Sequence, residues 1–139
     1  MTDMVRFGAS LPAPLIKAFD ESIRRKGYAT RSEAIRDLMR QHLVDQEWEK
    51  ASGEVIATVT IVYDHETREL SRVLNSLQHQ FHEAIVCSTH VHVDAHHCLE
   101  VIIIKGRSEE VRAIADRLIS TKGVKHGRLV STTTGQGLA

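Results

Sequence analysis

Apolar and polar side chains alternate near the start of the chain. The apolar positions are Val5, Phe7, Ala9 and Leu11, and the polar positions between them are Arg6, Gly8 and Ser10. This period of two predicts a short strand with one apolar and one polar face. Pro12 and Pro14 follow it, and proline ends a strand and suits the first turn of a helix.

Two helices are predicted after this strand. Apolar residues recur at helical spacing on both sides of a break at Gly27: Leu15, Ile16, Phe19 and Ile23, then Ala34, Ile35, Leu38, Met39 and Leu43. Thr30 and Glu33 form a capping box at the start of the second helix. A strand and two helices of fewer than about 50 residues bury too little surface to be stable alone. We therefore expect a dimer in which the strand pairs with its copy.

A polar stretch ends at Ser52 and Gly53, and the pattern then changes. Strands are predicted over 55–65, 84–94, 98–106 and 124–134, and helices over 66–81 and 108–123. The order β-α-β-β-α-β is the split-βαβ or ferredoxin-like plan. The sequence thus predicts an α+β protein with a β-α-α domain at 1–49 and a ferredoxin-like domain at 53–134.

The amino-acid composition excludes few classes of function. The chain has 18 basic and 18 acidic residues, so its overall charge does not indicate nucleic acid or a membrane surface. No apolar run approaches the roughly 20 residues that span a bilayer, and the N-terminus does not resemble a signal peptide. We expect a cytoplasmic protein without a membrane partner. Two cysteines do not make a disulfide framework.

The stretch CSTHVHVDAHHC, residues 87–98, holds both cysteines and four of the nine histidines. His90 and His92 are two apart on a predicted strand, so both imidazoles share one face. If the connection to the next strand has an odd effective length, Cys98 lies across from His92 on that face. Val91 and Leu99 would then face the helix layer. Cys87 falls on the Val91 side, where we expect a buried thiol.

Two nitrogens and a sulfur leave at least one ligand position of a metal open. His79 and His82 in the preceding helix could provide a fourth ligand, but that helix is expected on the other face of its sheet. A ligand from a neighbouring chain is therefore attractive. Imidazole and thiolate suit zinc, copper or nickel. The alternative is a solvated sheet face with one buried cysteine, and His96 and His97 in the turn are more easily solvated.

Five motifs in order resemble the NikR nickel-responsive transcriptional regulators. They are GYATRSEAIRD, QH, HVH, CLE and GVKHG, and the resemblance covers residues 4–130. The N-terminal part alone resembles the broader class of ribbon-helix-helix repressors. The resemblance implies a homotetramer in which two ribbon-helix-helix dimers flank four ferredoxin-like (ACT-type) domains.

The resemblance also implies a ligand set. His90, His92 and Cys98 would bind Ni(II) in one subunit, and His79 of another subunit would complete a square plane. Glu100 would accept a hydrogen bond from an imidazole. The resemblance further implies that the targets are nickel-uptake genes, which are repressed when nickel is plentiful.

The DNA-binding face implied by the resemblance is the polar row of the first strand, Arg6, Gly8 and Ser10. Arg6 could contact a guanine base through two N–H donors of its guanidinium group. Backbone N–H groups around Arg31 and Ser32 suit a phosphate of double-stranded operator DNA. Glu33 and Asp37 match acidic residues that help some relatives bind an alkali cation, and a helix cap with a surface charge is the alternative.

Other functions find less support in the sequence. It has no nucleophile elbow, P-loop or H-E-x-x-H helix, so we do not expect an enzyme. A copper or zinc sensor could use the same ligands. A ribbon-helix-helix repressor whose ACT-type domain binds an amino acid is the remaining alternative.

Overall fold

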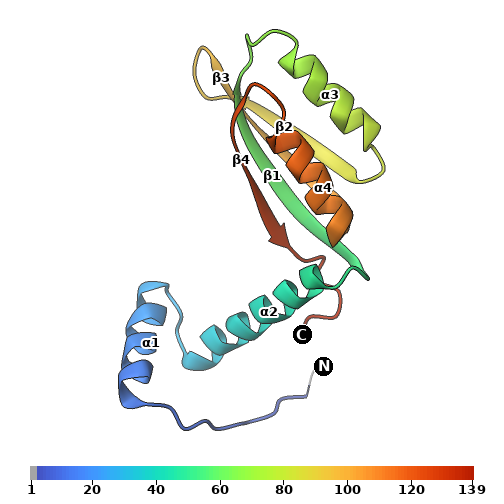
Figure 1. The fold of residues 1–139 in the computed structure, drawn as a ribbon. Helices are drawn as coiled ribbons and strands as arrows, with labels where there is room; N and C mark the ends of the chain where they lie inside the picture. Colours follow the sequence, from blue (N-terminus) through green and yellow to red (C-terminus); the bar gives the residue numbers. More distant parts are fainter. Residues whose placement is uncertain (1–2) are drawn as a thin grey trace. The chain divides into compact units, whose positions relative to one another are not determined.

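The computed structural model describes residues 3–139, which divide into two compact units (Figure 1). The N-terminal unit runs up to Leu43 and includes Gly137–Ala139, and the C-terminal unit is Val44–Gln136. None of the helices in the described part of the chain combines the length and apolarity needed to cross a bilayer.

Two helices form the N-terminal unit, α1 (Ala13–Arg25) and the first part of α2 (Arg31–Glu49). The predicted cap is present: the N–H of Glu33 donates to Thr30 Oγ1 at 3.2 Å. The Glu33 carboxylate accepts from the N–H of Ala29 at 3.3 Å, one residue before the position in a standard capping box. The Arg31 guanidinium donates twice to the Asp20 carboxylate, at 2.8 and 2.7 Å, and so connects the two helices.

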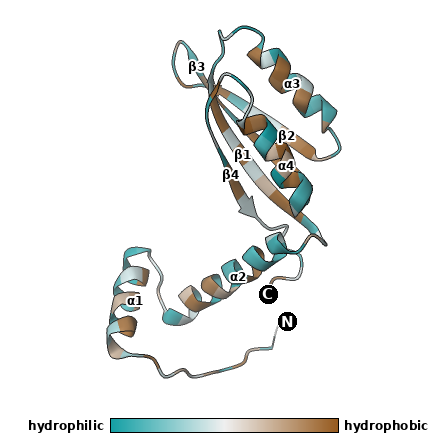
Figure 2. Cartoon of the chain, in the orientation of Figure 1, coloured by the Kyte–Doolittle hydropathy of each residue, from teal (hydrophilic) through white to brown (hydrophobic). Residues whose placement is uncertain are grey.

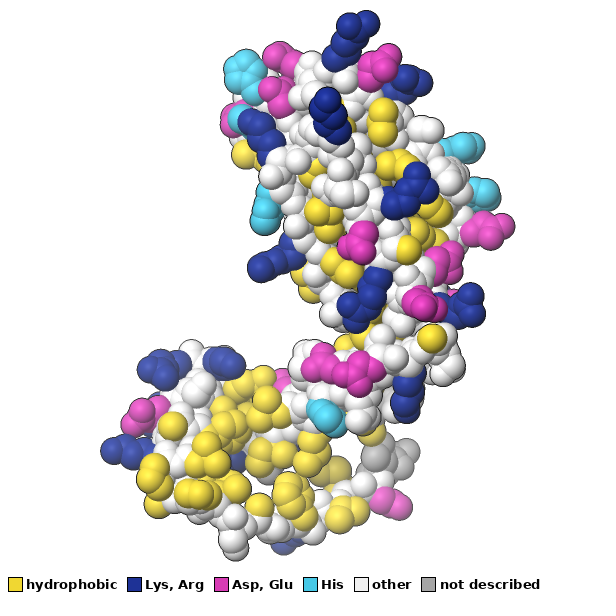
Figure 3. Space-filling view, viewed as in Figure 1, with side chains coloured by type: hydrophobic (Ala, Val, Ile, Leu, Met, Phe, Trp, Pro, Cys, Tyr) yellow, Lys and Arg dark blue, Asp and Glu magenta, His cyan; other side chains and the backbone are white. Residues whose placement is uncertain are grey.

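The segment before α1 is not a strand in the single chain. Residues 3–12 form no ladder, and their apolar side chains are open to solvent, with Val5 85% and Phe7 65% exposed. A lone strand has no partner for its N–H and C=O groups, so the predicted strand needs a second copy. The remaining large exposed apolar residues of this unit are Met4, Leu11, Leu15, Leu38, Met39 and Leu43, and Figure 3 shows hydrophobic side chains gathered over this unit. This apolar face is too large to be typical of a monomer.

The C-terminal unit has the predicted β-α-β-β-α-β order. Its strands are β1 (Glu54–Asp64), β2 (Ile85–His92), β3 (His97–Arg107) and β4 (Val124–Thr132), and its helices are α3 (Leu70–Gln80) and α4 (Ser108–Ile119). The strands form one antiparallel sheet in the order β2-β3-β1-β4. The helices α3 and α4 each alternate hydrophilic and hydrophobic bands (Figure 2), as helices with one buried face do.

One face of the sheet is buried under helices. Its buried residues come from β1 (Val55, Ala57, Val59, Ile61, Tyr63), β3 (Cys98, Glu100, Ile102, Ile104) and α4 (Val111, Ile114, Ala115, Leu118). Cys98 and Glu100 therefore lie on the helix-facing side. The expectation that Leu99 faces the helix layer was wrong: it lies on the other face and is half-buried. Both faces of β3 are largely apolar, so alternation did not distinguish them.

Three further contacts fix this unit. A Cβ on Gly127 would lie 2.7 Å from Ile119 Cγ1, so glycine allows β4 to pack closely against the end of α4. The buried Trp48 indole donates to the carbonyl of Thr132 at 2.8 Å. The Arg112 guanidinium lies 5.2 Å from the Trp48 ring centre, within the range of a cation–π contact.

Candidate metal centre

Three potential metal ligands converge at one end of the sheet. Ligand atoms of His65, His92 and Cys98 all lie within 4.8 Å of one another. Cys98 Sγ is 3.4 Å from Nδ1 of His65 and 3.6 Å from Nδ1 of His92. The sulfur is buried, whereas His65 is half-buried and His92 is exposed. The group therefore combines a protected thiol with imidazoles that solvent can reach.

Strand pairing explains this convergence. In the β2–β3 ladder His92 lies opposite Cys98, and His90 lies opposite Glu100. The predicted shared face of His90, His92 and Cys98 is therefore present. On its other side Cys98 pairs with Tyr63 of β1, and His65 follows Tyr63 by two residues. Because β3 lies between β2 and β1, Cys98 is flanked by His92 on the β2 side and by His65 on the β1 side.

His90 lies beside this group. Its ring is 5.4 Å from the His92 ring and is stacked at 6.0 Å on the ring of Tyr63. His79 is exposed near the end of α3, with its ring 6.1 Å from that of His82. Among residues 3–139, the group of three potential ligands contains neither His79 nor His90.

Glu100 is a buried acidic residue that lies opposite His90 in the β2–β3 ladder. Its Oε1 accepts from the Tyr63 hydroxyl at 2.8 Å, and its Oε2 accepts from the Gln78 amide at 2.6 Å. Burial and then the bond to Glu100 raise the pKa of Tyr63 well above its usual value. In the single chain the carboxylate thus serves a phenol and an amide, whereas the sequence predicted an imidazole partner. These bonds connect α3 to the sheet beside the candidate ligands.

Burial raises the pKa of the Cys98 thiol, and the negative charges of Asp64, Glu100 and Asp94 raise it further. The thiol is therefore neutral at ordinary pH, unless a cation compensates the charge of its thiolate. A divalent metal ion would do so, because a coordinated thiol loses its proton. Imidazole and thiolate donors fit Ni(II), Cu(II) or Zn(II).

The comparisons with known proteins identify the family. Residues 56–132 match the family described as "NikR C terminal nickel binding domain", and residues 5–46 match "Ribbon-helix-helix protein, copG family". The chain belongs to the NikR family. Its sequence is 53% identical to two proteins named "Putative nickel-responsive regulator", one from Geobacter sp. (strain M21), over 99% of both chains, and one from Pyrococcus furiosus, over 97% of this chain and 98% of the other.

A solved structure supports the fold. An uncharacterized protein from Thermotoga maritima superimposes with a TM-score of 0.52 at 21% identity, covering 58% of this chain and all of its own. The match to the ribbon-helix-helix family and the antiparallel α+β unit confirm the predicted fold class. The NikR family is one of transcriptional regulators, so a role other than catalysis agrees with this membership.

The carboxylate of Asp94 holds the β2–β3 turn in place. Asp94 Oδ1 accepts from the backbone N–H groups of His96 and His97, both at 2.8 Å. His97 Nδ1 lies 3.0 Å from Asp94 Oδ2, and its Nε2 lies 2.7 Å from Lys125 Nζ.

Cys87 lies opposite Ile103, on the side predicted, but its thiol is exposed. The expectation of a buried thiol was therefore wrong for the single chain.

The residues predicted to contact DNA are all in the N-terminal unit. Arg6, Gly8 and Ser10 are exposed in the segment that lacks a ladder partner. Ser32 is exposed in the first turn of α2, and the side chain of Arg31 is engaged with Asp20. The backbone of this turn therefore remains the part suited to a phosphate.

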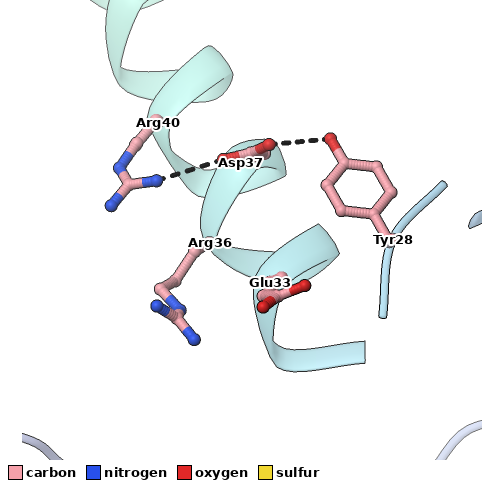
Figure 4. A pocket seen from close by; sticks show the side chains of 5 residues that line it. All are labelled: Tyr28, Glu33, Arg36, Asp37 and Arg40. Atoms are coloured by element: carbon pink, nitrogen blue, oxygen red, sulfur yellow. Dashed lines mark hydrogen bonds and ion pairs between the residues drawn. The ribbon is translucent and has the colours of Figure 1, made fainter. Parts of the chain in front are cut away.

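Figure 4 shows the residues proposed from the family for an alkali cation. Glu33 and Asp37 line a shallow pocket with Tyr28, Arg36 and Arg40. Asp37 accepts from the Tyr28 hydroxyl at 2.7 Å and pairs with Arg40 at 3.1 Å. The bond to Asp37 raises the pKa of Tyr28. Within the N-terminal unit these carboxylates thus serve a helix cap and an ion pair.

Three residues of the centre were not singled out from the sequence: His65, Tyr63 and Gln78. A usable signal was present, because His65 and Tyr63 have the same parity at the end of a strand. Using it required the strand order, which places β1 next to β3. Gln78 lies one residue before His79, in the QH motif that resembles the family.

Proposed function

We propose that this NikR-family protein is a nickel-dependent repressor. Ni(II) is bound by His90, His92 and Cys98 of one chain and by His79 of the partner subunit. The observation that carries the proposal is the pairing of His92 with Cys98, with His90 on the same face. These three side chains leave a fourth position that must be filled from elsewhere, and His79 is exposed on α3.

The donor set favours the metal. Two imidazoles and a thiolate of one chain, with an imidazole of another, would suit Ni(II), which would hold the two chains together. The His90 ring is stacked on Tyr63 and lies 5.4 Å from the His92 ring, so it would have to turn toward His92 to bind the same ion. Glu100 holds Tyr63 and Gln78 in place beside these histidines.

The N-terminal unit provides the DNA contacts. Residues 1–49 pair with those of a second chain, which covers the exposed apolar face and gives the segment at 5–11 a strand partner. The row of Arg6, Gly8 and Ser10 then faces the major groove from a two-stranded ribbon, and the side chain of Arg6 contacts base edges. The backbone N–H groups at Arg31 and Ser32 bind a phosphate of the DNA. Glu33 and Asp37 would be the ligands of an alkali cation.

The metal acts by linkage. A homotetramer is formed by the domains at 53–134, and nickel between chains fixes their arrangement. Nickel must bind the DNA-competent arrangement better than the others, because otherwise it shifts no equilibrium. Two ribbon pairs then bind two half-sites of a palindrome, and the second contact is intramolecular. With a net charge near zero, binding to random DNA is weak, so nickel decides whether nickel-uptake genes are repressed.

The test begins with selection from random duplex DNA by the full-length protein, with and without Ni(II). We expect a palindromic sequence to be enriched only with nickel. His90→Ala should abolish the nickel-dependent retention of the enriched duplex, and His96→Ala should leave it intact. Arg6→Ala should abolish DNA binding without weakening nickel binding. Equal retention with and without nickel would contradict the proposal.

A further inference from the structure

The three converging donors do not coincide with the proposed nickel ligands. They include His65 in place of His90, and all belong to one chain. We propose that His65, His92 and Cys98 form a second metal site, held within a single subunit, that selects a tetrahedral ion such as Zn(II). The site shares His92 and Cys98 with the proposed nickel site, so an ion can occupy only one of the two.

The distances favour a tetrahedral ion. With Zn–S near 2.3 Å and Zn–N near 2.0–2.1 Å, a tetrahedral angle separates sulfur and nitrogen by about 3.6 Å, and a right angle by about 3.1 Å. The two nitrogen–sulfur distances here are 3.4 and 3.6 Å. Both imidazoles present Nδ1 to the same sulfur, and their rings meet edge to face at 5.4 Å. The sulfur therefore lies at a suitable distance from each nitrogen, and the side chains would adjust for one ion to contact all three.

The surroundings of the three ligands suit a divalent cation whose fourth coordination position is open to solvent. The carboxylates of Asp64, Glu100 and Asp94 place negative charge around the sulfur of Cys98. The same negative charges attract a divalent ion at the sulfur. His65 and His92 are not buried, so an ion can enter from solvent and keep a water as its fourth ligand, as three-ligand zinc sites do.

This site gives the protein a way to distinguish metals, a consequence that rests on the proposed nickel function. Zinc bound by His65, His92 and Cys98 needs no ligand from a partner subunit, so it does not fix the tetramer. It also withholds two nickel ligands. Zinc should then occupy the protein without promoting DNA binding, and it should compete with nickel.

Absorption of Co(II), a spectroscopic substitute for Zn(II), tests the site directly. The full-length His79→Ala protein should give the intense visible bands of a tetrahedral, thiolate-bound ion at one Co(II) per chain, because His79 is not needed. Adding His65→Ala should remove these bands and weaken Zn(II) binding at least about tenfold, since loss of even an outer partner of a metal ligand costs that much. His65→Asn should do the same, which separates ligation from local folding.

Two matched variants complete the experiment. His96→Ala removes a neighbouring exposed histidine, and His90→Ala removes the nickel ligand outside the group; both should retain the Co(II) bands. The proposal is overturned if the bands survive His65→Ala, if His90→Ala removes them instead, or if no tetrahedral spectrum forms at one Co(II) per chain. None of these readouts uses DNA or nickel, so failure of the nickel function would leave them unchanged.

Competition then tests the consequence. In the wild-type protein, excess Zn(II) should reduce Ni(II) binding, and His65→Ala should need at least about tenfold more Zn(II) for the same effect, in proportion to its weaker zinc affinity. An unchanged Zn(II) requirement would show that zinc does not use His65 when it displaces nickel.

Discussion

His92 lies directly across the β2–β3 ladder from Cys98, with its Nδ1 3.6 Å from the sulfur. This pair belongs to both proposed metal sites. Cys98→Ala should therefore abolish nickel binding and any thiolate charge-transfer absorption. Cys87→Ala is the matched control, because the Cys87 thiol is exposed on the other face and should be dispensable. Calorimetric titration with Ni(II) compares the two, and nickel binding by Cys98→Ala at wild-type affinity would exclude this ligand.

Tyr63→Phe should weaken the C-terminal unit, because the hydroxyl donates to the buried Glu100 carboxylate. Loss of a hydrogen bond to a charged group costs about 1.5–3 kcal/mol. Urea unfolding of metal-free protein can be followed by the fluorescence of Trp48, the single tryptophan, which is buried in this unit. Tyr28→Phe, whose bond to Asp37 is exposed, should change the free energy of unfolding much less.

The same substitution carries a pH dependence. The pKa of Tyr63 is higher in the folded state than in the unfolded state. The hydrogen bond of its hydroxyl therefore contributes fully to the free energy of unfolding below the unfolded-state pKa of about 10, and this contribution declines as the pH rises above that pKa. The difference in unfolding free energy between wild type and Tyr63→Phe should shrink above that pH. A difference that stays constant or grows there would be inconsistent with the buried bond.

Gly127→Ala should destabilise the C-terminal unit by about 1–3 kcal/mol, the usual cost of overpacking. The added Cβ would meet Ile119 at 2.7 Å, and this β-branched side chain has little freedom to move. Trp48 fluorescence in urea measures the effect. Ser131→Ala, an exposed position on the same strand, should stay close to wild type; equal stability of both variants would mean that Ile119 repacks freely.

Leu38→Glu should prevent pairing of the N-terminal units. Leu38 is 59% exposed in the single chain, so the substitution should not unfold the helix, but it would place a charge in the proposed interface. Sedimentation should show a smaller assembly, and DNA binding should be lost while nickel binding by the C-terminal unit persists. Gln46→Glu, also exposed on α2, serves as the control. An unchanged assembly would place the contact elsewhere.

The sequence predicted what depends on local periodicity. The spacing of His90 and His92 was sufficient to place both on one face, because strand parity is fixed by the backbone. Placing Cys98 on that face depended on an assumed length of the turn, and the pairing of His92 with Cys98 agrees with it. Thr30 and Glu33 similarly marked the start of α2. Both features are set within a few residues of chain.

What depends on distant segments was missed. His65 joins Cys98 only because β1 pairs with β3, which no local pattern specifies. The helix-facing side of β3 was misassigned because Leu99 and Ile102, on opposite faces, are equally apolar. The predicted strand at 5–11 is absent from the single chain because its stabilising bonds would come from another molecule.

Mixing of variant subunits tests the inter-chain nickel site most directly. His79→Ala and His90→Ala should each fail to form the square-planar nickel–thiolate spectrum. When the two are unfolded together and refolded, a chain with intact His90, His92 and Cys98 can meet His79 of the partner subunit, so part of the spectrum should return. If the mixture stays as inactive as its components, or if His79→Ala alone gives the full spectrum, nickel is not bound between chains in this way.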